Sequence, residues 1–195
     1  MTPETAAATA PSRMDYPVQW ALTCRAVLAM LFGLAEGAMI LLAFWLPRIT
    51  VALMGTLFAG FALLDGLVAL FAAAWGWRRG GRWRLLACKG LTGVAAGIAV
   101  MFQAPGQKPG ALAIFACWAI VTGLLQTVEA LFLGTHRGRP VLVATALLSL
   151  AFGAIVLVRP PQDLMTLVMH VAAYGILLGL LRLIVAIRLQ SPDLV

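Results

Sequence analysis

The sequence predicts an all-α integral membrane protein, with six transmembrane helices forming three tandem helical hairpins in a pseudo-three-fold arrangement. Three observations lead to this prediction. Of the 195 residues, 63% are hydrophobic and only 11% are charged, and the mean hydropathy is +0.99. Six apolar runs follow one another, each close to the 20 or so residues that a helix needs to cross a bilayer. The runs also repeat in pairs with a nearly fixed period, which is typical of an internally repeated architecture.

The apolar runs are separated only by short segments that carry proline, glycine and basic residues. The runs cover approximately residues 20–46, 49–77, 83–103, 110–133, 140–158 and 163–188. Backbone groups in hydrocarbon must be hydrogen-bonded within their own segment, and no run alternates like a barrel strand, so each run is expected to be a helix. So little polar material cannot cover a soluble surface.

Glycines mark the repeat. The second run of each pair contains a Gly-Leu step, with spacings of 57 and 56 residues, at Gly66, Gly123 and Gly179. The first runs share a glycine with spacings of 60 and 60 residues, at Gly33, Gly93 and Gly153. The repeats are therefore expected at approximately 20–77, 83–133 and 140–188, within one membrane domain over 18–190. Two spans per repeat make the copies parallel, related by an axis along the membrane normal.

The turns and tails follow from proline and from polar composition. The three hairpins are expected to turn at Pro47, at Pro105 to Pro109 and at Arg159-Pro160-Pro161. Asp163, just after the last of these turns, is expected to cap the following helix. Residues 1–17 contain no apolar core, so they are expected to be a disordered cytosolic tail and not a signal peptide. Residues 191–195 are expected to be a second cytosolic tail.

Lysine and arginine are unevenly distributed among the loops. With the N-terminus inside, the cytosolic segments contain eight of them, namely Arg13, Arg78, Arg79, Arg82, Arg84, Arg137, Arg139 and Arg188. The outer turns contain three, namely Arg48, Lys108 and Arg159. The positive-inside rule then places both termini in the cytoplasm. The 78–84 loop either determines topology alone or also contacts anionic inner-leaflet lipid, at about 1 kcal/mol per basic residue.

Small residues four positions apart are expected to bring helices into close contact. The pairs are Gly33/Gly37, Gly93/Gly97, Ser149/Gly153 and Gly175/Gly179. Exposed pairs of this kind would equally serve contacts with a second copy or with another membrane protein, and the sequence leaves this open. Cys24, Cys88 and Cys117 lie inside apolar runs without metal-ligand spacing, so they are expected to pack as small apolar residues between helices. No cofactor or metal is implied.

Four segments resemble the HdeD-type acid-resistance membrane proteins. They are RAVLAMLFG at 25–33, KGLTGVAAGIAV at 89–100, FGAIVLVRP at 152–160 and YGILLGLLRLIVAIRL at 174–189. The resemblance covers roughly residues 18–190 and implies a bacterial inner-membrane protein of three short two-helix repeats with a role in tolerance of low pH. It implies no catalytic residues. This chain departs from the family in a longer middle turn over 103–110 and in a first repeat without an arginine equivalent to Arg182.

Seven ionisable residues lie at membrane depth, where each charge costs about 2.5–3.5 kcal/mol on insertion scales and marks a candidate functional site. At 1.5 Å per residue, five of them lie toward the cytosolic ends of their helices, namely Arg25, Asp65, Lys89, Glu129 and Arg182. Glu36 and His170 lie in the outer third, on the first and last helices, which become neighbours if the three-fold arrangement closes. Thr122, Gln126 and Glu129 form a polar stripe on one helix face.

Two interpretations of these charges compete. In the first, Asp65 and Glu129 pair with Arg25, Lys89 or Arg182 and only fix how the helices pack, while long basic side chains extend to the interface. In the second, the bundle axis holds a polar path in which a desolvated Glu36 and His170 sense or relay protons. The first is preferred for the cytosolic cluster.

The motifs and the distribution of charge restrict the possible functions of the protein. No nucleophile elbow, P-loop, HExxH or CxxC motif is present, so an enzyme is not expected. Nucleic acid is not expected as a partner, because the basic residues behind the net charge of +7 lie in short loops between apolar runs. The preferred interpretation is that the chain is a non-catalytic membrane protein that organises the bilayer or binds a partner. The alternative is a small transporter or channel for protons or a small solute.

Overall fold

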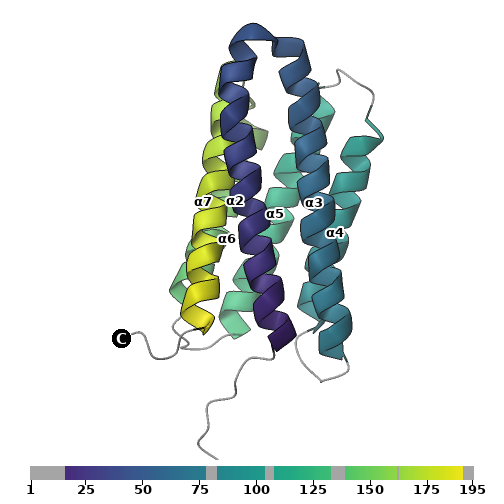
Figure 1. Ribbon diagram of the computed structural model, residues 1–195, viewed down its shortest axis with the longest axis vertical. Coiled ribbons are helices and arrows are strands. Elements are labelled where there is room, and N and C mark those ends of the chain that lie inside the picture. The colour runs from purple at the N-terminus through teal and green to yellow at the C-terminus, as the bar shows by residue number, and fades with distance from the viewer. Residues whose placement is uncertain (1–15, 78–82, 104–107, 133–138, 162, 191–195) are drawn as a thin grey trace, which may run out of the picture.

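The computed structural model describes residues 16–77, 83–103, 108–132, 139–161 and 163–190, and these form a bundle of six helices (Figure 1). The helices are α2 (Tyr16–Trp45), α3 (Pro47–Trp77), α4 (Trp83–Met101), α5 (Lys108–Phe132), α6 (Arg139–Val158) and α7 (Leu164–Gln190). No strand occurs among the described residues. The predicted helical class is confirmed, and each predicted run matches one helix. The expected tails at 1–17 and 191–195 lie almost wholly outside the described residues.

The hairpins place both described ends of the chain on one side of the bundle (Figure 1). We call this the terminal side, and the opposite side, where α2 meets α3 at Leu46, the distal side. That first turn is tight: only Leu46 separates the two helices, and Pro47 begins α3. Proline suits the first helical position because its fixed φ fits the helix and its missing N–H would have no helical partner there.

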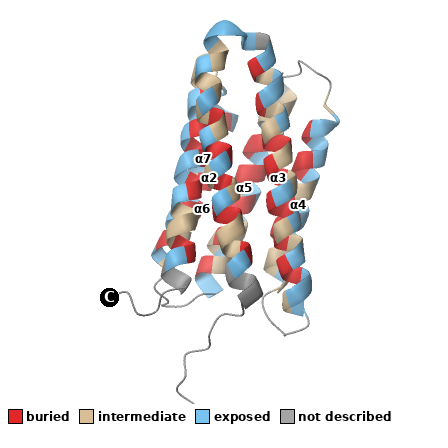
Figure 2. Cartoon of the chain, in the orientation of Figure 1, coloured by how far each residue is buried: buried red, intermediate tan, exposed pale blue. Residues whose placement is uncertain are grey.

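All six helices are long and apolar enough to cross a membrane. The spans run from Trp20–Trp45 at the N-terminal end to Met165–Ile187 at the C-terminal end. Figure 2 shows exposed positions along the outside of the bundle and over the α2–α3 turn. Large apolar side chains occupy many of them, for example Leu41, Phe44 and Trp45, which are 73%, 74% and 84% exposed. Such an apolar exterior fits lipid and identifies a multi-pass membrane protein.

The most extensive helix contacts join different hairpins. They occur between α2 and α7, between α3 and α4, and between α5 and α6, whereas the two helices of each hairpin contact each other less. The predicted closure of the ring through its first and last helices is confirmed. Three strong and three weak interfaces alternate around the ring, which fits the pseudo-three-fold arrangement.

Glycines explain the strong interfaces. A Cβ on Gly33 would meet the backbone of Ile176 in α7, and one on Gly93 would lie 2.9 Å from the carbonyl oxygen of Ala62 in α3. A Cβ on Gly153 would lie 2.7 Å from the carbonyl oxygen of Ala116 in α5. Only residues without a side chain let backbones approach so closely, which is how helices associate where lipid removes the hydrophobic drive.

Two details of the predicted packing are wrong. A Cβ on Gly37 would meet nothing within 4 Å, so Gly37 does not belong to the α2–α7 seam. Cys88 and Cys117 are exposed, so these two thiols do not pack between helices, whereas Cys24 is half-buried. In both cases the residue lies in the expected helix but on another face, because depth in the bilayer does not determine rotation about the helix axis.

The second helix of each hairpin faces the interior. In an apolar 18-residue stretch of each span, 50%, 39% and 44% of the residues are buried in α3, α5 and α7, against 28%, 33% and 33% in α2, α4 and α6. Between the inner helices, large side chains pack in two layers at equivalent repeat positions, which we call the aromatic layers because five of the six side chains are aromatic. The layers contain Phe58, Phe115 and Val171, and then Phe61, Trp118 and Tyr174. Rings contact across the centre, as between Phe58 and Phe115 with centroids 4.4 Å apart, so side chains close the interior at these two layers.

Asp163 caps α7, as predicted. Its Oδ2 accepts a hydrogen bond from the backbone N–H of Thr166 over 2.7 Å. This bond favours the charged form and lowers the pKa of Asp163. A lowered pKa means that the cap stabilises the fold fully above the ordinary aspartate pKa of about 3.9 and loses this effect as the pH falls through the lowered value.

We therefore expect Asp163→Ala to lower the unfolding temperature at neutral pH, and the difference from wild type to vanish in strong acid. Asp163→Asn should retain most of the cap, since asparagine is an equally good N-cap residue. Thermal unfolding of the purified protein in detergent at pH 7 and at about pH 2 would measure this. An equal difference between Asp163→Ala and wild type at both pH values would contradict a charged cap.

Candidate functional site

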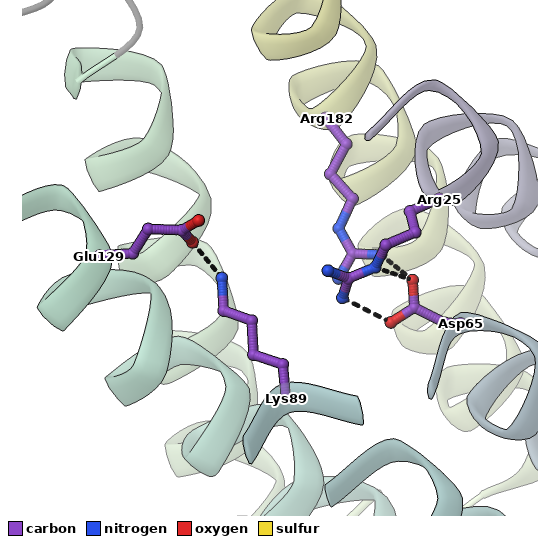
Figure 3. A network of polar contacts seen from close by, with 5 residues as sticks. All are labelled: Arg25, Asp65, Lys89, Glu129 and Arg182. Atoms are coloured by element: carbon purple, nitrogen blue, oxygen red, sulfur yellow. Dashed lines mark hydrogen bonds and ion pairs between the residues drawn. The ribbon is translucent and has the colours of Figure 1, made fainter. Parts of the chain in front are cut away.

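Asp65, on α3, accepts hydrogen bonds from two arginines (Figure 3). Arg25 on α2 donates from Nε to Oδ1 and from Nη2 to Oδ2, each over 2.8 Å. Arg182 on α7 donates from Nη1 to Oδ1 over 3.0 Å. The planar guanidinium matches a carboxylate in such a two-point contact. One carboxylate thus joins both helices of the first hairpin to the last helix of the third.

A second ion pair lies across the bundle (Figure 3). Lys89 on α4 donates from Nζ to Oε2 of Glu129 on α5. The Lys89 side chain is 6% exposed and that of Glu129 is 22% exposed, so the carboxylate is nearer the edge of the bundle. The predicted pairing of Asp65 and Glu129 with Arg25, Arg182 and Lys89 is thereby confirmed. The five residues contribute three positive charges and two negative ones.

A polar contact also closes the third hairpin. The hydroxyls of Ser149 on α6 and Tyr174 on α7 are 3.1 Å apart and hydrogen-bonded. Among the described residues, a polar contact thus joins the two helices of every hairpin, at Arg25–Asp65, Lys89–Glu129 and Ser149–Tyr174. In these interfaces, none of the described glycines packs against the backbone of the other helix. The Ser149–Tyr174 contact was not predicted, because the four-residue spacing of Ser149 and Gly153 indicated only a small residue in a helix seam.

The predicted polar stripe of α5 faces the interior on the terminal side of the aromatic layers. Thr122 and Gln126 are both buried. The Thr122 hydroxyl donates to the carbonyl oxygen of Trp118 over 2.8 Å, one turn earlier in the same helix. Gln126 Oε1 has no hydrogen-bond partner among the described residues. The stripe continues the ion-paired cluster inward and ends at the aromatic layers.

Glu36 lies apart from this cluster, in the distal half of α2. It is completely buried, and neither carboxylate oxygen has a hydrogen-bond partner among the described residues. Glu36 lines a cavity of about 70 Å³ whose other walls come from α3, α4, α5 and α7. Glu36 therefore faces the interior of the bundle, as the polar-path interpretation requires.

His170 points the other way. Its side chain is exposed, and Nδ1 donates to the backbone carbonyl oxygen of Thr166 over 2.6 Å, within α7. It does not line the Glu36 cavity. Although α2 and α7 are neighbours, the structure does not bring Glu36 and His170 together as the proton-relay hypothesis requires.

The chain belongs to the protein family described as "Short repeat of unknown function (DUF308)", which it matches at residues 24–102, 110–158 and 144–193. The number of matches agrees with the three predicted repeats, although the first match extends over α4 as well as α2 and α3. The match at 110–158 pairs α5 with α6, two helices of different hairpins that pack closely through glycine. No curated protein and no solved structure matches the chain.

Proposed function

We propose that this protein is a non-catalytic, multi-pass protein of the bacterial inner membrane that supports acid tolerance by organising the membrane or binding a partner. One observation carries the proposal: the two aromatic layers close the interior between the distal cavity and the ion-paired cluster. A closed interior and paired charges favour a structural or interaction role over the passage of solutes. The resemblance to HdeD-type proteins supports the acid-stress role, and the basic loops support cytoplasmic termini.

The ion-paired cluster fits this role. A charge within a membrane usually marks a transport path or a structural partner. Here the charges occupy helix interfaces without glycine packing, where a polar contact fixes the angle and register of two helices. We infer that Arg25, Asp65, Arg182, Lys89 and Glu129 hold the bundle together, and that the surface presented to lipid or to a partner depends on them.

Proton flux into proteoliposomes tests the proposal. The purified protein is reconstituted with a pH-sensitive dye inside and exposed to an inward acid gradient, and we expect no more flux than in empty liposomes. Glu36→Gln and His170→Ala are measured beside wild type. Flux that both substitutions abolish would replace the proposal with a proton pathway, and flux that survives them would establish transport by another route.

The acid-stress role needs a separate measurement. Bacteria that lack their own relative of this protein would be challenged with acid, with and without its expression. We expect higher survival with the wild-type protein and no benefit from Asp65→Asn, which removes the central carboxylate. Equal survival with and without the wild-type protein would reject the role in acid tolerance.

A transporter or channel for protons or a small solute is the second candidate, and Glu36 is the observation that favours it. A buried carboxylate beside a cavity is a typical site for a coupling ion or a cationic solute. The aromatic layers argue against a continuous path in this conformation.

A further inference from the structure

The Glu36 cavity lies where the three inner helices converge on the distal side. Six of its lining residues form two sets of repeat-equivalent positions, twelve and eight residues before the repeat glycines Gly66, Gly123 and Gly179. The sets are Met54, Ala111 and Leu167, and Phe58, Phe115 and Val171. Equivalent residues from all three repeats can line one cavity only near the pseudo-three-fold axis. The cavity therefore lies on that axis, with the first aromatic layer as its floor.

The cavity depends on one glycine. Eleven residues before the repeat glycines, the three repeats have Gly55, Leu112 and Val168. Gly55 lines the cavity, and a Cβ there would meet only Cγ1 of Val100, at an ordinary 3.9 Å. Close backbone approach therefore does not require glycine at this position, unlike at Gly33 or Gly93. A side chain like those of the other repeats would extend into the space that the cavity occupies.

The carboxylate is also specific to the first repeat. Three residues after the shared glycines of the first helices, the repeats have Glu36, Ala96 and Val156, all buried. The scaffold thus accepts an apolar residue at this position. A buried carboxylate without a partner destabilises the fold by several kcal/mol unless it is neutralised or paired. The first repeat thus combines a destabilising carboxylate with the glycine that opens space beside it.

From these features we propose that the cavity is a binding site for a small organic monocation, of the primary alkylammonium class, that enters from the distal side. Among the described residues that line the cavity, Glu36 alone is charged, and the others are apolar or glycine. A ligand that matches it must therefore have one positive charge and a short apolar body. The rings of Phe58 and Phe115 add favourable contact with a cation. At about 70 Å³, the cavity is far below the roughly 300–1,000 Å³ of sites for drug-sized ligands.

The probe is n-propylammonium chloride, and the neutral comparison is 1-propanol, which has the same carbon chain. Binding to the full chain in lipid nanodiscs is measured by saturation-transfer difference NMR, with empty nanodiscs as background. We expect wild type to bind the ammonium ion well above background and more tightly than the alcohol. Glu36→Gln should weaken ammonium binding by at least about tenfold and leave the alcohol unaffected.

Two further variants keep the test decisive. Gly55→Leu should fill the cavity while leaving Glu36 in place, and should abolish ammonium binding. This variant tests the site independently if Glu36→Gln does not fold. Asp163→Asn removes an exposed distal carboxylate that does not line the cavity, and should bind like wild type.

The proposal fails if folded wild type does not bind propylammonium above empty nanodiscs, a result that would leave the proton as the ligand of Glu36. It also fails if folded Glu36→Gln or Gly55→Leu binds as well as wild type. Binding without flux would leave the proposed function intact, since a cation can bind beside Glu36 without crossing the aromatic layers.

Discussion

Asp65→Asn is expected to destabilise the protein by on the order of 3–5 kcal/mol, enough to remove most folded protein from a detergent extract. The substitution preserves size and removes one negative charge. Arg25 and Arg182, whose side chains are 10% and 11% exposed, then lie beside each other without a counter-ion. A buried pair that loses one partner leaves an uncompensated charge, and here one substitution leaves two. Size-exclusion chromatography and thermal unfolding in detergent measure the loss.

Asp163→Asn is the matched control, because it makes the same chemical change at an exposed residue and should leave the elution profile unchanged. A triple variant tests the cause. Arg25→Met, Asp65→Leu and Arg182→Met together replace the whole network with apolar side chains, which is often neutral or stabilising at buried ion pairs. We expect the triple variant to recover folded protein that Asp65→Asn loses. An unfolding temperature of Asp65→Asn equal to that of wild type would instead mean that water reaches both arginines.

The depth of the five charged residues in the bilayer predicts that they form ion pairs. It does not predict which cation pairs with which carboxylate. Counting residues from the helix ends placed Arg25, Lys89, Arg182, Asp65 and Glu129 in one slab of the bilayer, where paired charges are stabilised. Which cation meets which carboxylate depends on the order of helices in the ring and on the rotation of each helix. Asp65 therefore receives two arginines from helices on either side of the α2–α7 seam, while Glu129 receives the lysine.

The same limit explains His170 and Gly37. Both were placed at the correct depth on the correct helix, and both face away from the expected neighbour. When a helix is apolar on all sides, its sequence does not predict which face is buried, because lipid and the protein interior are equally apolar. Glu36 was the better prediction, because it lies three residues after Gly33 and shares the buried side of α2.

The distal cavity and the aromatic layers could not be predicted from the sequence, because they depend on how the three repeats are arranged in space. Phe58, Phe115 and Val171 look like ordinary apolar residues along the chain, and so does Gly55. Their common role appears once the three second helices surround one axis, where Gly55 leaves space that Leu112 and Val168 occupy in the other repeats. The repeat spacing of 57 and 56 residues predicts which residues are equivalent. It does not predict that the second helices of the hairpins are the inner ones.

Among the glycines that the structure describes, Gly33 is expected to be the one whose replacement by alanine is most damaging, because Gly33→Ala should separate the first and third hairpins. An added Cβ would meet the backbone of α7, including Cα of Ile176 at 2.8 Å. Backbone cannot move aside as a flexible side chain can, so α2 and α7 must shift apart along their whole contact. Overpacking usually lowers the free energy of unfolding by about 1–3 kcal/mol. We expect Gly33→Ala to lie at or above the upper end of that range.

Gly37→Ala is the matched control, one turn further along the same helix. A Cβ there meets nothing within 4 Å, and alanine is better than glycine in a helix interior by up to about 1 kcal/mol. We expect Gly37→Ala to unfold at or above the wild-type temperature, while Gly33→Ala unfolds well below it. Comparable losses in both variants would show that glycine acts through helix flexibility and not through the α2–α7 contact.

A second substitution identifies the interface itself. Gly175 faces Gly33 across the seam, and a Cβ on Gly175 would lie 2.7 Å from the Gly33 Cα. Once Gly33→Ala has forced the helices apart, Gly175→Ala should cost little more, so the two losses should be clearly less than additive. Full additivity would mean that the two glycines act at independent sites. Sub-additive loss would assign much of the stability of the ring to close backbone packing between hairpins, which adds to the Arg182–Asp65 ion pair where lipid provides no hydrophobic drive.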